Sequence, residues 1–222
     1  MKTLSAALAV LVTMASLTAA ETTAGWKSLF DGTSLEGWRS LKSGTPGAGW
    51  KVEDGAIVLE AKSGAGDLVT KAEFGDFELT LEWKVAEATN SGIIYRVGLG
   101  EDHTYTTGPE YQVLDNVKGE DNHPASHTAA ALYDLVAPPA DYTKPVGEWN
   151  SARIRVRGWH IEQWLNGHKT VDIDLASPEG KAEIAKSKFA TWPKFASLSR
   201  GHIALQDHGH AVSYRKIKIR SL

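Results

Sequence analysis

The sequence predicts an all-β protein, a two-sheet antiparallel β-sandwich or jelly roll with long loops over a concave face. Many short segments alternate apolar and polar residues, which is the period of a half-buried strand. Turn-forming residues separate these segments, and the 222 residues include 21 glycines. Only residues 177–188 have a helical pattern, with a proline near its start. We found no repeat and no domain boundary, so we expect a single domain over residues 21–222.

The first predicted strands lie in the middle of the chain. From Phe77 to Val85 every second residue is apolar, and the residues between them are Glu, Thr, Glu and Lys. Residues 93–97 form the next strand, after the turn residues 90–92. Residues 153–157 alternate Arg with apolar residues and predict a further strand.

Two local signals define the C-terminal strands. Residues 161–165 lead into Asn166-Gly167, a dipeptide typical of a tight β-hairpin, and residues 171–173 continue beyond it. The apolar residues change parity between Tyr214 and Ile217, which predicts a β-bulge near Arg215-Lys216.

The N-terminus predicts export. Residues 1–20 have the pattern of a signal peptide, with Lys2, an apolar run over 4–17 and the small-residue site Thr18-Ala19-Ala20. The apolar run is shorter than the roughly 20 residues that a membrane span needs. We therefore expect a periplasmic or secreted bacterial protein without a membrane anchor.

Composition excludes several classes of protein. The net charge of -3 argues against nucleic acid as a partner, since binding it needs a basic surface. The chain has no cysteine, which excludes disulfides, thiol nucleophiles and Cys-ligated metals. No serine-hydrolase elbow, phosphate loop or dinucleotide fingerprint occurs, so we expect no organic cofactor.

Strand parity gathers polar residues that are candidates for a site. Long loops over residues 98–144 and a strand near residues 110–114 provide the setting, because loops on a rigid scaffold commonly carry function. If the apolar parity forms the core, the opposite parity lines either a concave cleft or a solvated outer face. The residues of that parity are Arg96, Glu110, Gln112, Gln206 and His208.

Histidines and tryptophans add candidates. His127, in the loop region, and His208 are the leading acid–base histidines, and Glu110 with His127 could hold one divalent metal ion, although no spacing matches a metal motif. Five tryptophans are either core residues or platforms for sugar rings: Trp38, Trp50, Trp149, Trp164 and Trp192.

A series of segments resembles one known family over nearly the whole chain after residue 25. The segments are Phe30–Trp38, Ser91–Arg96, Glu110–Asn116, Ala131–Asp134, Gly147–Asn150, Trp164–Gly167, Ile203–Gly209 and Tyr214–Ile219. In this order they resemble the 3-keto-disaccharide hydrolase family. The resemblance implies a concanavalin A-like jelly roll, bacterial export and cleavage of glycosides whose sugar a separate sugar 3-dehydrogenase has oxidised to a 3-ketone.

The implied chemistry assigns roles to the candidates. A ketone at C3 acidifies the C2 hydrogen, so a modest base can remove it and the C1 substituent can leave. We expect His127 or His208 as base or acid, and Arg96, or a metal in its place, as the group that stabilises the enolate. Glu110 would orient substrate or bind the metal. The expected sugar-binding residues are Gln112, Gln206, Tyr95, Asp115 and Tyr133.

Two other functions remain open at this point. The same fold serves non-catalytic, lectin-like carbohydrate-binding modules, because fold alone does not define function. A retaining glucanase would need two carboxyl groups about 5–5.5 Å apart, and the strand with Glu110 offers a single carboxylate on its face. That makes the glucanase the weakest of the three hypotheses.

Overall fold

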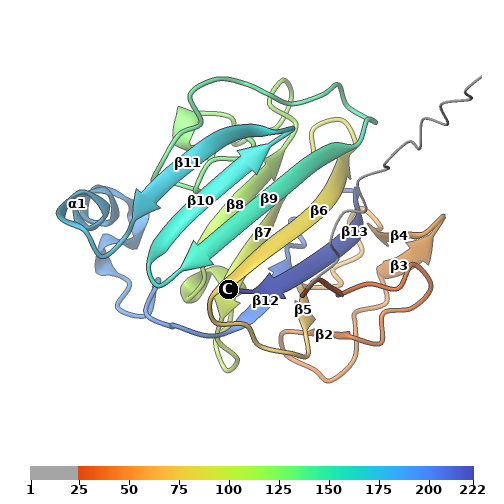
Figure 1. Cartoon of the computed structure of the whole chain (residues 1–222). Helices are drawn as coiled ribbons and strands as arrows, with labels where there is room; N and C mark the ends of the chain where they lie inside the picture. The colour runs from red at the N-terminus through yellow and green to blue at the C-terminus, as the bar shows by residue number, and fades with distance from the viewer. Residues whose placement is uncertain (1–24) are drawn as a thin grey trace, which may run out of the picture.

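The computed structural model describes residues 25–222, which form two antiparallel β-sheets packed face to face (Figure 1). The larger sheet has the order β11 (His168–Asp174), β10 (His160–Leu165), β9 (Asn150–Arg157), β6 (Phe77–Val85), β13 (Val212–Ser221), β4 (Ala56–Leu59) and β3 (Trp50–Glu53), and β1 (Lys27–Ser28) also pairs with β13. The smaller sheet has the order β2 (Trp38–Ser40), β5 (Leu68–Thr70), β12 (His202–Leu205), β7 (Asn90–Val97) and β8 (Glu110–Leu114). The predicted all-β two-sheet sandwich is confirmed.

Helical structure in the described residues is confined to short segments that connect strands. The predicted helix is confirmed as α1 (Pro178–Lys186), whose N-cap Ser177 accepts a hydrogen bond from the Gly180 amide. Short 3₁₀ helices lie in the loops before and after β8 and in the segment after α1. They are η1 (Thr104–Thr106), η2 (Ala125–His127) and η3 (Lys188–Thr191). Within residues 25–222, no helix has the length and apolar character needed to cross a membrane. The expected signal peptide over 1–20 lies outside the described residues.

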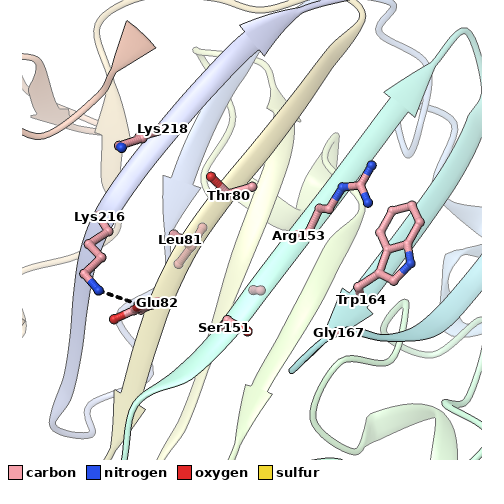
Figure 2. A pocket seen from close by; sticks show the side chains of 10 residues that line it. Thr80, Leu81, Glu82, Ser151, Arg153, Trp164, Gly167, Lys216 and Lys218 are labelled. Atoms are coloured by element: carbon pink, nitrogen blue, oxygen red, sulfur yellow. Dashed lines mark hydrogen bonds and ion pairs between the residues drawn. The ribbon is translucent and has the colours of Figure 1, made fainter. Parts of the chain in front are cut away.

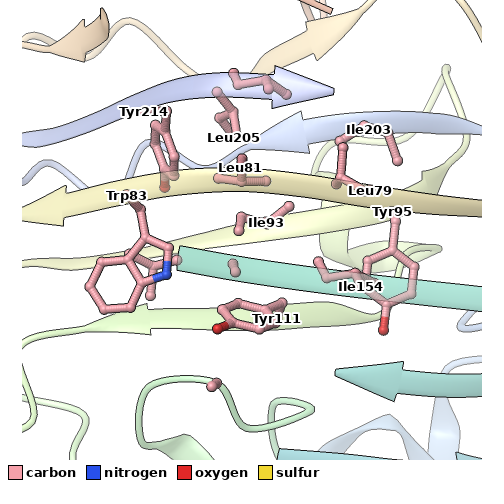
Figure 3. Close-up of a cluster of buried hydrophobic side chains, with 14 of the residues drawn as sticks. Leu79, Leu81, Trp83, Ile93, Tyr95, Tyr111, Ile154, Ile203, Leu205 and Tyr214 are labelled. Carbon is pink, nitrogen blue, oxygen red and sulfur yellow. The ribbon is translucent and has the colours of Figure 1, made fainter. Parts of the chain in front are cut away.

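The core lies between the two sheets. Figure 3 shows Leu79, Leu81 and Trp83 of β6 facing Ile93 and Tyr95 of β7. All five side chains are at most 2% exposed. The apolar residues predicted to alternate along β6 are therefore the ones that face the core, because every second side chain of a strand points to the same face.

Local turn chemistry agrees with the hairpin and bulge predictions. Asn166 and Gly167 both have positive φ, at 50° and 85°, and connect β10 to β11 as a two-residue turn of the kind that Asn-Gly favours. The β13–β6 register shifts between Arg215 and Lys218, so the bulge is confirmed.

The turn expected at residues 90–92 is wrong. Asn90 and Ser91 already pair with Leu114 and Val113 of β8, so β7 begins three residues earlier than the composition suggests. The reversal occurs before them, where Ala88 adopts a φ of 59°. Polar residues occupy this part of the strand because one of its faces lies outside the core.

Replacing Leu79 with Ala should lower the free energy of unfolding by about 2–5 kcal/mol, because it leaves a cavity between the sheets. Its neighbour Thr80 is half-buried on the opposite face, so Thr80→Ala should stay within about 1 kcal/mol of the wild type. Urea unfolding of both variants checks this. Equal losses would contradict the assignment of faces on β6.

Candidate functional site

A pocket of about 240 Å³ lies on the face of the smaller sheet that points away from the core. Strands β7 and β8 provide its floor, and η1, the loop around residue 121 and η3 provide its walls. We call it the Glu110 pocket, and its lining residues are Asn90, Tyr105, Glu110, Gln112, Asp121, Tyr133, Lys188, Trp192, Gln206 and His208. Four of the five residues predicted from parity therefore meet in one cavity.

Glu110 is a buried carboxyl group at the floor of this pocket. It is 7% exposed, and its side chain makes no hydrogen bond to any residue that the structure describes. Burial raises the pKa of Glu110 to about 8, and the nearby Lys188 ammonium only partly opposes that rise. A carboxyl group with such a pKa and no partner is equipped to exchange a proton with a ligand near neutral pH.

Gly92 provides the space that the Glu110 side chain occupies. A Cβ atom at position 92 would collide with Oε1 of Glu110, so a larger residue does not fit there without displacing that side chain. Glycine in the interior of a strand commonly marks such a close approach. The carboxyl group of Glu110 on β8 thus lies directly over the backbone of β7.

Two glutamines provide acceptor groups in the pocket. The side-chain oxygens of Gln112 and Gln206 are buried and have no hydrogen-bond partner among the described residues. The Gln112 amide nitrogen donates to Asn90 Oδ1 at 3.4 Å, which leaves its oxygen unsatisfied. Because unpartnered buried polar atoms are costly, groups of this kind suit a ligand that brings its own hydroxyl donors.

Tyr133 forms one wall of the pocket, and hydrogen bonds fix both its hydroxyl group and its backbone. Its hydroxyl group donates to Asp121 Oδ2 at 2.7 Å, and its backbone N–H donates to the Glu110 carbonyl at 3.0 Å. Burial, reinforced by the Asp121 carboxylate, raises the pKa of Tyr133, so the phenol stays protonated.

Lys188 is the cation of the pocket. Its Nζ lies 4.2 Å from the centre of the Tyr133 ring, a cation–π distance, and it makes no ion pair within residues 25–222. Its position at the start of η3 places it beside Glu110, although the two residues are far apart in sequence. A positive charge close to a proton-exchanging carboxyl group can stabilise an anion formed between them.

The structure does not bring Arg96 to this pocket, which corrects the parity prediction. The register between β7 and β12 shifts between His202 and Ile203, and Arg96 is the extra residue of this bulge, with a φ of 55°. Its guanidinium group turns away to donate to the Gly158 carbonyl at 2.5 Å and to pair with Asp76 at 3.1 Å. Arg96 is 3% exposed and joins the smaller sheet to one end of the larger one.

Two further predicted sugar-binding residues lie outside the pocket lining. Tyr95 is fully buried in the core, where its hydroxyl group accepts a hydrogen bond from Gln163 at 3.2 Å. Asp115 caps the turns beside β8 by accepting from the backbone N–H groups of Ala88 and Val117. Both side chains are committed to structural contacts.

His127 lies behind Tyr133, and His208 lies at the mouth of the pocket. The His127 ring contacts Asp121 Oδ1 through Nδ1 at 2.7 Å and Asp134 Oδ1 through Nε2 at 2.9 Å. Both ring nitrogens are engaged by Asp121 and Asp134, and His127 does not line the pocket whose floor holds Glu110, so the expected Glu110–His127 metal site does not fit this arrangement. No group of three His, Asp or Glu side chains among residues 25–222 could hold a metal ion.

The tryptophans divide between three environments. Trp192 lines the Glu110 pocket, with its ring 6.0 Å from that of Tyr105, and is the aromatic residue best placed for a sugar. Trp38 and Trp50 are buried in the core. Trp149 and Trp164 lie under cationic side chains: Arg215 stands 4.0 Å from the Trp149 ring and Arg153 4.2 Å from the Trp164 ring.

A larger pocket, of about 440 Å³, lies on the outer face of the larger sheet (Figure 2). Three of its charged residues already have partners: Lys216 pairs with Glu82 at 2.8 Å, and Arg153 pairs with Glu78 beside the pocket. None of its lining residues has a buried polar atom without a partner in the described part of the chain. It is a hollow in a solvated sheet face, and the Glu110 pocket is the better candidate.

Comparison with known proteins supports the same conclusion about family. The model of the 3-keto-alpha-glucoside-1,2-lyase-like domain matches residues 25–220. The chain belongs to this family.

Individual relatives agree with that membership. A Bacteroides thetaiotaomicron protein named 3-keto-disaccharide hydrolase is 32% identical over 89% of this chain and 79% of its own length. A Parabacteroides distasonis crystal structure, provisionally described as a glycosyl hydrolase, has a TM-score of 0.83 at 30% identity and covers 93% of this chain and 98% of that one. The Bacillus subtilis carbohydrate-binding module CBM66 matches at a TM-score of 0.52 and 14% identity, covering 83% of this chain and 96% of that one, which shows the fold alone.

In this member of the 3-keto-alpha-glucoside-1,2-lyase-like family, sequence reasoning missed four of the pocket residues: Asn90, Tyr105, Asp121 and Lys188. Three of them lie in loops or 3₁₀ segments, where no periodicity indicates the direction of a side chain. The one available signal was the long loop region over residues 98–144, which includes Tyr105 and Asp121 and was expected to carry function because it is a long loop on a rigid scaffold.

The stability of the protein should fall as pH rises from about 5 to 8, because folded Glu110 keeps its proton to about pH 8 and the unfolded chain releases it near pH 4.5. The Glu110 share of this loss approaches about 4 kcal/mol at pH 8. Glu110→Gln should remove it, as measured by urea unfolding at pH 5, 6, 7 and 8. The exposed, Lys51-paired Glu60 has a lowered pKa, so Glu60→Gln should keep the wild-type slope. A wild-type slope in Glu110→Gln would refute the assignment.

Proposed function

We propose that this protein is an exported enzyme that cleaves 3-keto-glycosides by removing the C2 proton and eliminating the C1 substituent. The observation that carries the proposal is the buried, unpartnered Glu110 carboxyl group beside the Lys188 ammonium in a pocket of sugar size. The family match and the name of the Bacteroides thetaiotaomicron relative support the substrate class.

Glu110 acts as the base in this proposal. Its carboxylate takes the hydrogen from C2, and the C–H electrons form an enolate whose negative charge lies on the C3 oxygen. Because Lys188 is the cation of the pocket, it stabilises that oxygen electrostatically. The protonated Tyr133 hydroxyl is a second donor on the same wall.

Collapse of the enolate completes the reaction. The C3 carbonyl forms again, a double bond forms between C1 and C2, and the C1–O bond breaks. His208, at the mouth of the pocket, supplies a proton to the departing oxygen. The products are an alcohol and a 1,2-unsaturated 3-keto sugar, and addition of water across that double bond gives net hydrolysis.

The remaining residues bind the sugar. The free oxygens of Gln112 and Gln206 accept hydrogen bonds from ring hydroxyl groups, and Trp192 packs against the apolar face of the ring. The substrate must come from an enzyme that oxidises a sugar at C3, a sugar 3-dehydrogenase. The signal-peptide pattern over residues 1–20 supports a periplasmic or secreted location in this proposal.

The purified protein should release the chromophore from a 3-keto-β-glucoside with a chromogenic aglycone and leave the parent glucoside intact. Glu110→Gln should lose about 10²–10⁴-fold in rate. Wild-type kcat/KM should increase with pH up to about 8, as Glu110 loses its proton. Release should survive EDTA, since the donor set does not fit a metal.

Three results would change the proposal. Binding of the keto-glucoside without release would identify a carbohydrate-binding module. A kcat/KM that falls through pH 8 would make Glu110 the acid instead of the base. Loss of activity with EDTA, restored by a divalent ion, would place a metal ion in the reaction.

Lys188→Met should lower kcat on the keto-glucoside by about 10²-fold, because it removes the charge that stabilises the enolate. The matched control is Lys186→Met, two residues away on α1, where Lys186 pairs with Glu183 at 2.8 Å. Stopped assays at saturating substrate compare the two variants. Equal activity of the two would show that Lys188 has no part in the chemistry.

A further inference from the structure

A chain of hydrogen bonds connects two walls of the Glu110 pocket through a histidine that does not line it. Starting from Tyr133, the hydroxyl group donates to Asp121, and Asp121 contacts Nδ1 of His127. On the other side, Nε2 of His127 contacts Asp134, whose second oxygen accepts the backbone N–H of Lys188 at 2.7 Å. We call these five residues the His127 network.

We propose that His127 is a positioning residue of this site: it holds Tyr133 through Asp121 and Lys188 through Asp134. This inference rests on the proposed function, which gives Tyr133 and Lys188 their roles in the reaction. It replaces the roles of base, acid and metal ligand that the sequence suggested for His127, because its ring does not line the pocket and its two nitrogens contact Asp121 and Asp134.

The contacts of the ring explain why histidine is needed here. The two ring nitrogens of a histidine lie on opposite sides of a rigid ring, so one side chain can contact a carboxyl group on each side. The ring also stacks on Tyr133, with 4.3 Å between the centroids and an interplanar angle of 27°. Its side chain is 14% exposed, so solvent competes little for these hydrogen bonds.

The second arm of the network fixes the start of η3. Asp134 has a φ of 59° and donates its own N–H to the Ser126 carbonyl at 3.0 Å, which aims its carboxylate at residue 188. The Lys188 amide that it accepts belongs to the first residue of η3. The orientation of the Lys188 side chain over Tyr133 therefore depends on Asp134, and through it on His127.

Because Nδ1 contacts Asp121 and Nε2 contacts Asp134, two different substitutions can test these two arms of the network separately. Asparagine at position 127 places its amide nitrogen near the position of Nδ1 and can serve Asp121. Glutamine reaches farther, near the position of Nε2, and can serve Asp134. His127→Ala removes both arms, and His160→Ala is the control, since the exposed His160–Asp172 pair at 2.7 Å lies on β10 and β11.

The first readout is kinetic. On a 3-keto-β-glucoside, His127→Ala should lower kcat by about 10²-fold, the effect of misplacing catalytic groups by about 1 Å. Both kcat and kcat/KM should fall together, since the lost interaction acts on the transition state. His127→Asn and His127→Gln should each recover part of this loss, and His160→Ala should match the wild type. Activity of His127→Ala equal to that of His160→Ala would overturn the proposal.

The second readout does not depend on activity. The Lys188 amide proton, hydrogen-bonded to a carboxylate, should resonate downfield and exchange slowly in ¹H–¹⁵N NMR spectra. This signature should persist in His127→Gln and His160→Ala and should be lost in His127→Asn and His127→Ala. An unchanged Lys188 amide in His127→Ala would overturn the inference. If wild-type protein fails to cleave the keto-glucoside while the amide responds as expected, the proposed function fails and the positioning role stands.

Discussion

The smaller sheet is buried on both faces, and this burial explains the chemical properties of the candidate site. One face packs against the larger sheet, and loops together with η3 cover part of the other. Every residue of β7 and β8 is consequently buried. A polar side chain on the second face must function in a desolvated environment, and this is what raises the pKa of Glu110 and leaves the two glutamine oxygens without partners.

The second face is also where the strands deviate from regular geometry. Gly92 leaves room for the Glu110 carboxyl group above β7. Four residues later, the bulge at Arg96 removes a cation from the same face and uses it to tie the two sheets together. Val97 then returns to that face, where it packs in a small apolar cluster with Ile94. Deviations from regular pairing commonly accompany functional sites, because they redirect side chains that alternation would place elsewhere.

The charge of the site is assembled from segments far apart in the sequence. Glu110 comes from a strand, Asp121 and His127 from the long loop, and Lys188 from the 3₁₀ helix after α1. Hydrogen bonds that carboxyl groups make with a backbone N–H group and with a histidine ring hold these segments in place relative to one another. The rigid sandwich and the polar network in the loops that cover it keep the side chains of the site in defined positions, although irregular segments form its walls.

The sandwich, its hairpin at Asn166-Gly167 and its bulge near Lys216 could all be predicted from the sequence, because period-two alternation and turn chemistry are local properties of the chain. It also placed Glu110, Gln112, Gln206 and His208 on one face. The folded structure was needed to show that Arg96 leaves that face and that Lys188 provides the cation instead. Both outcomes depend on a bulge opposite β12 and on the path of a loop over the sheet, and these are set by packing between distant segments that no local pattern records.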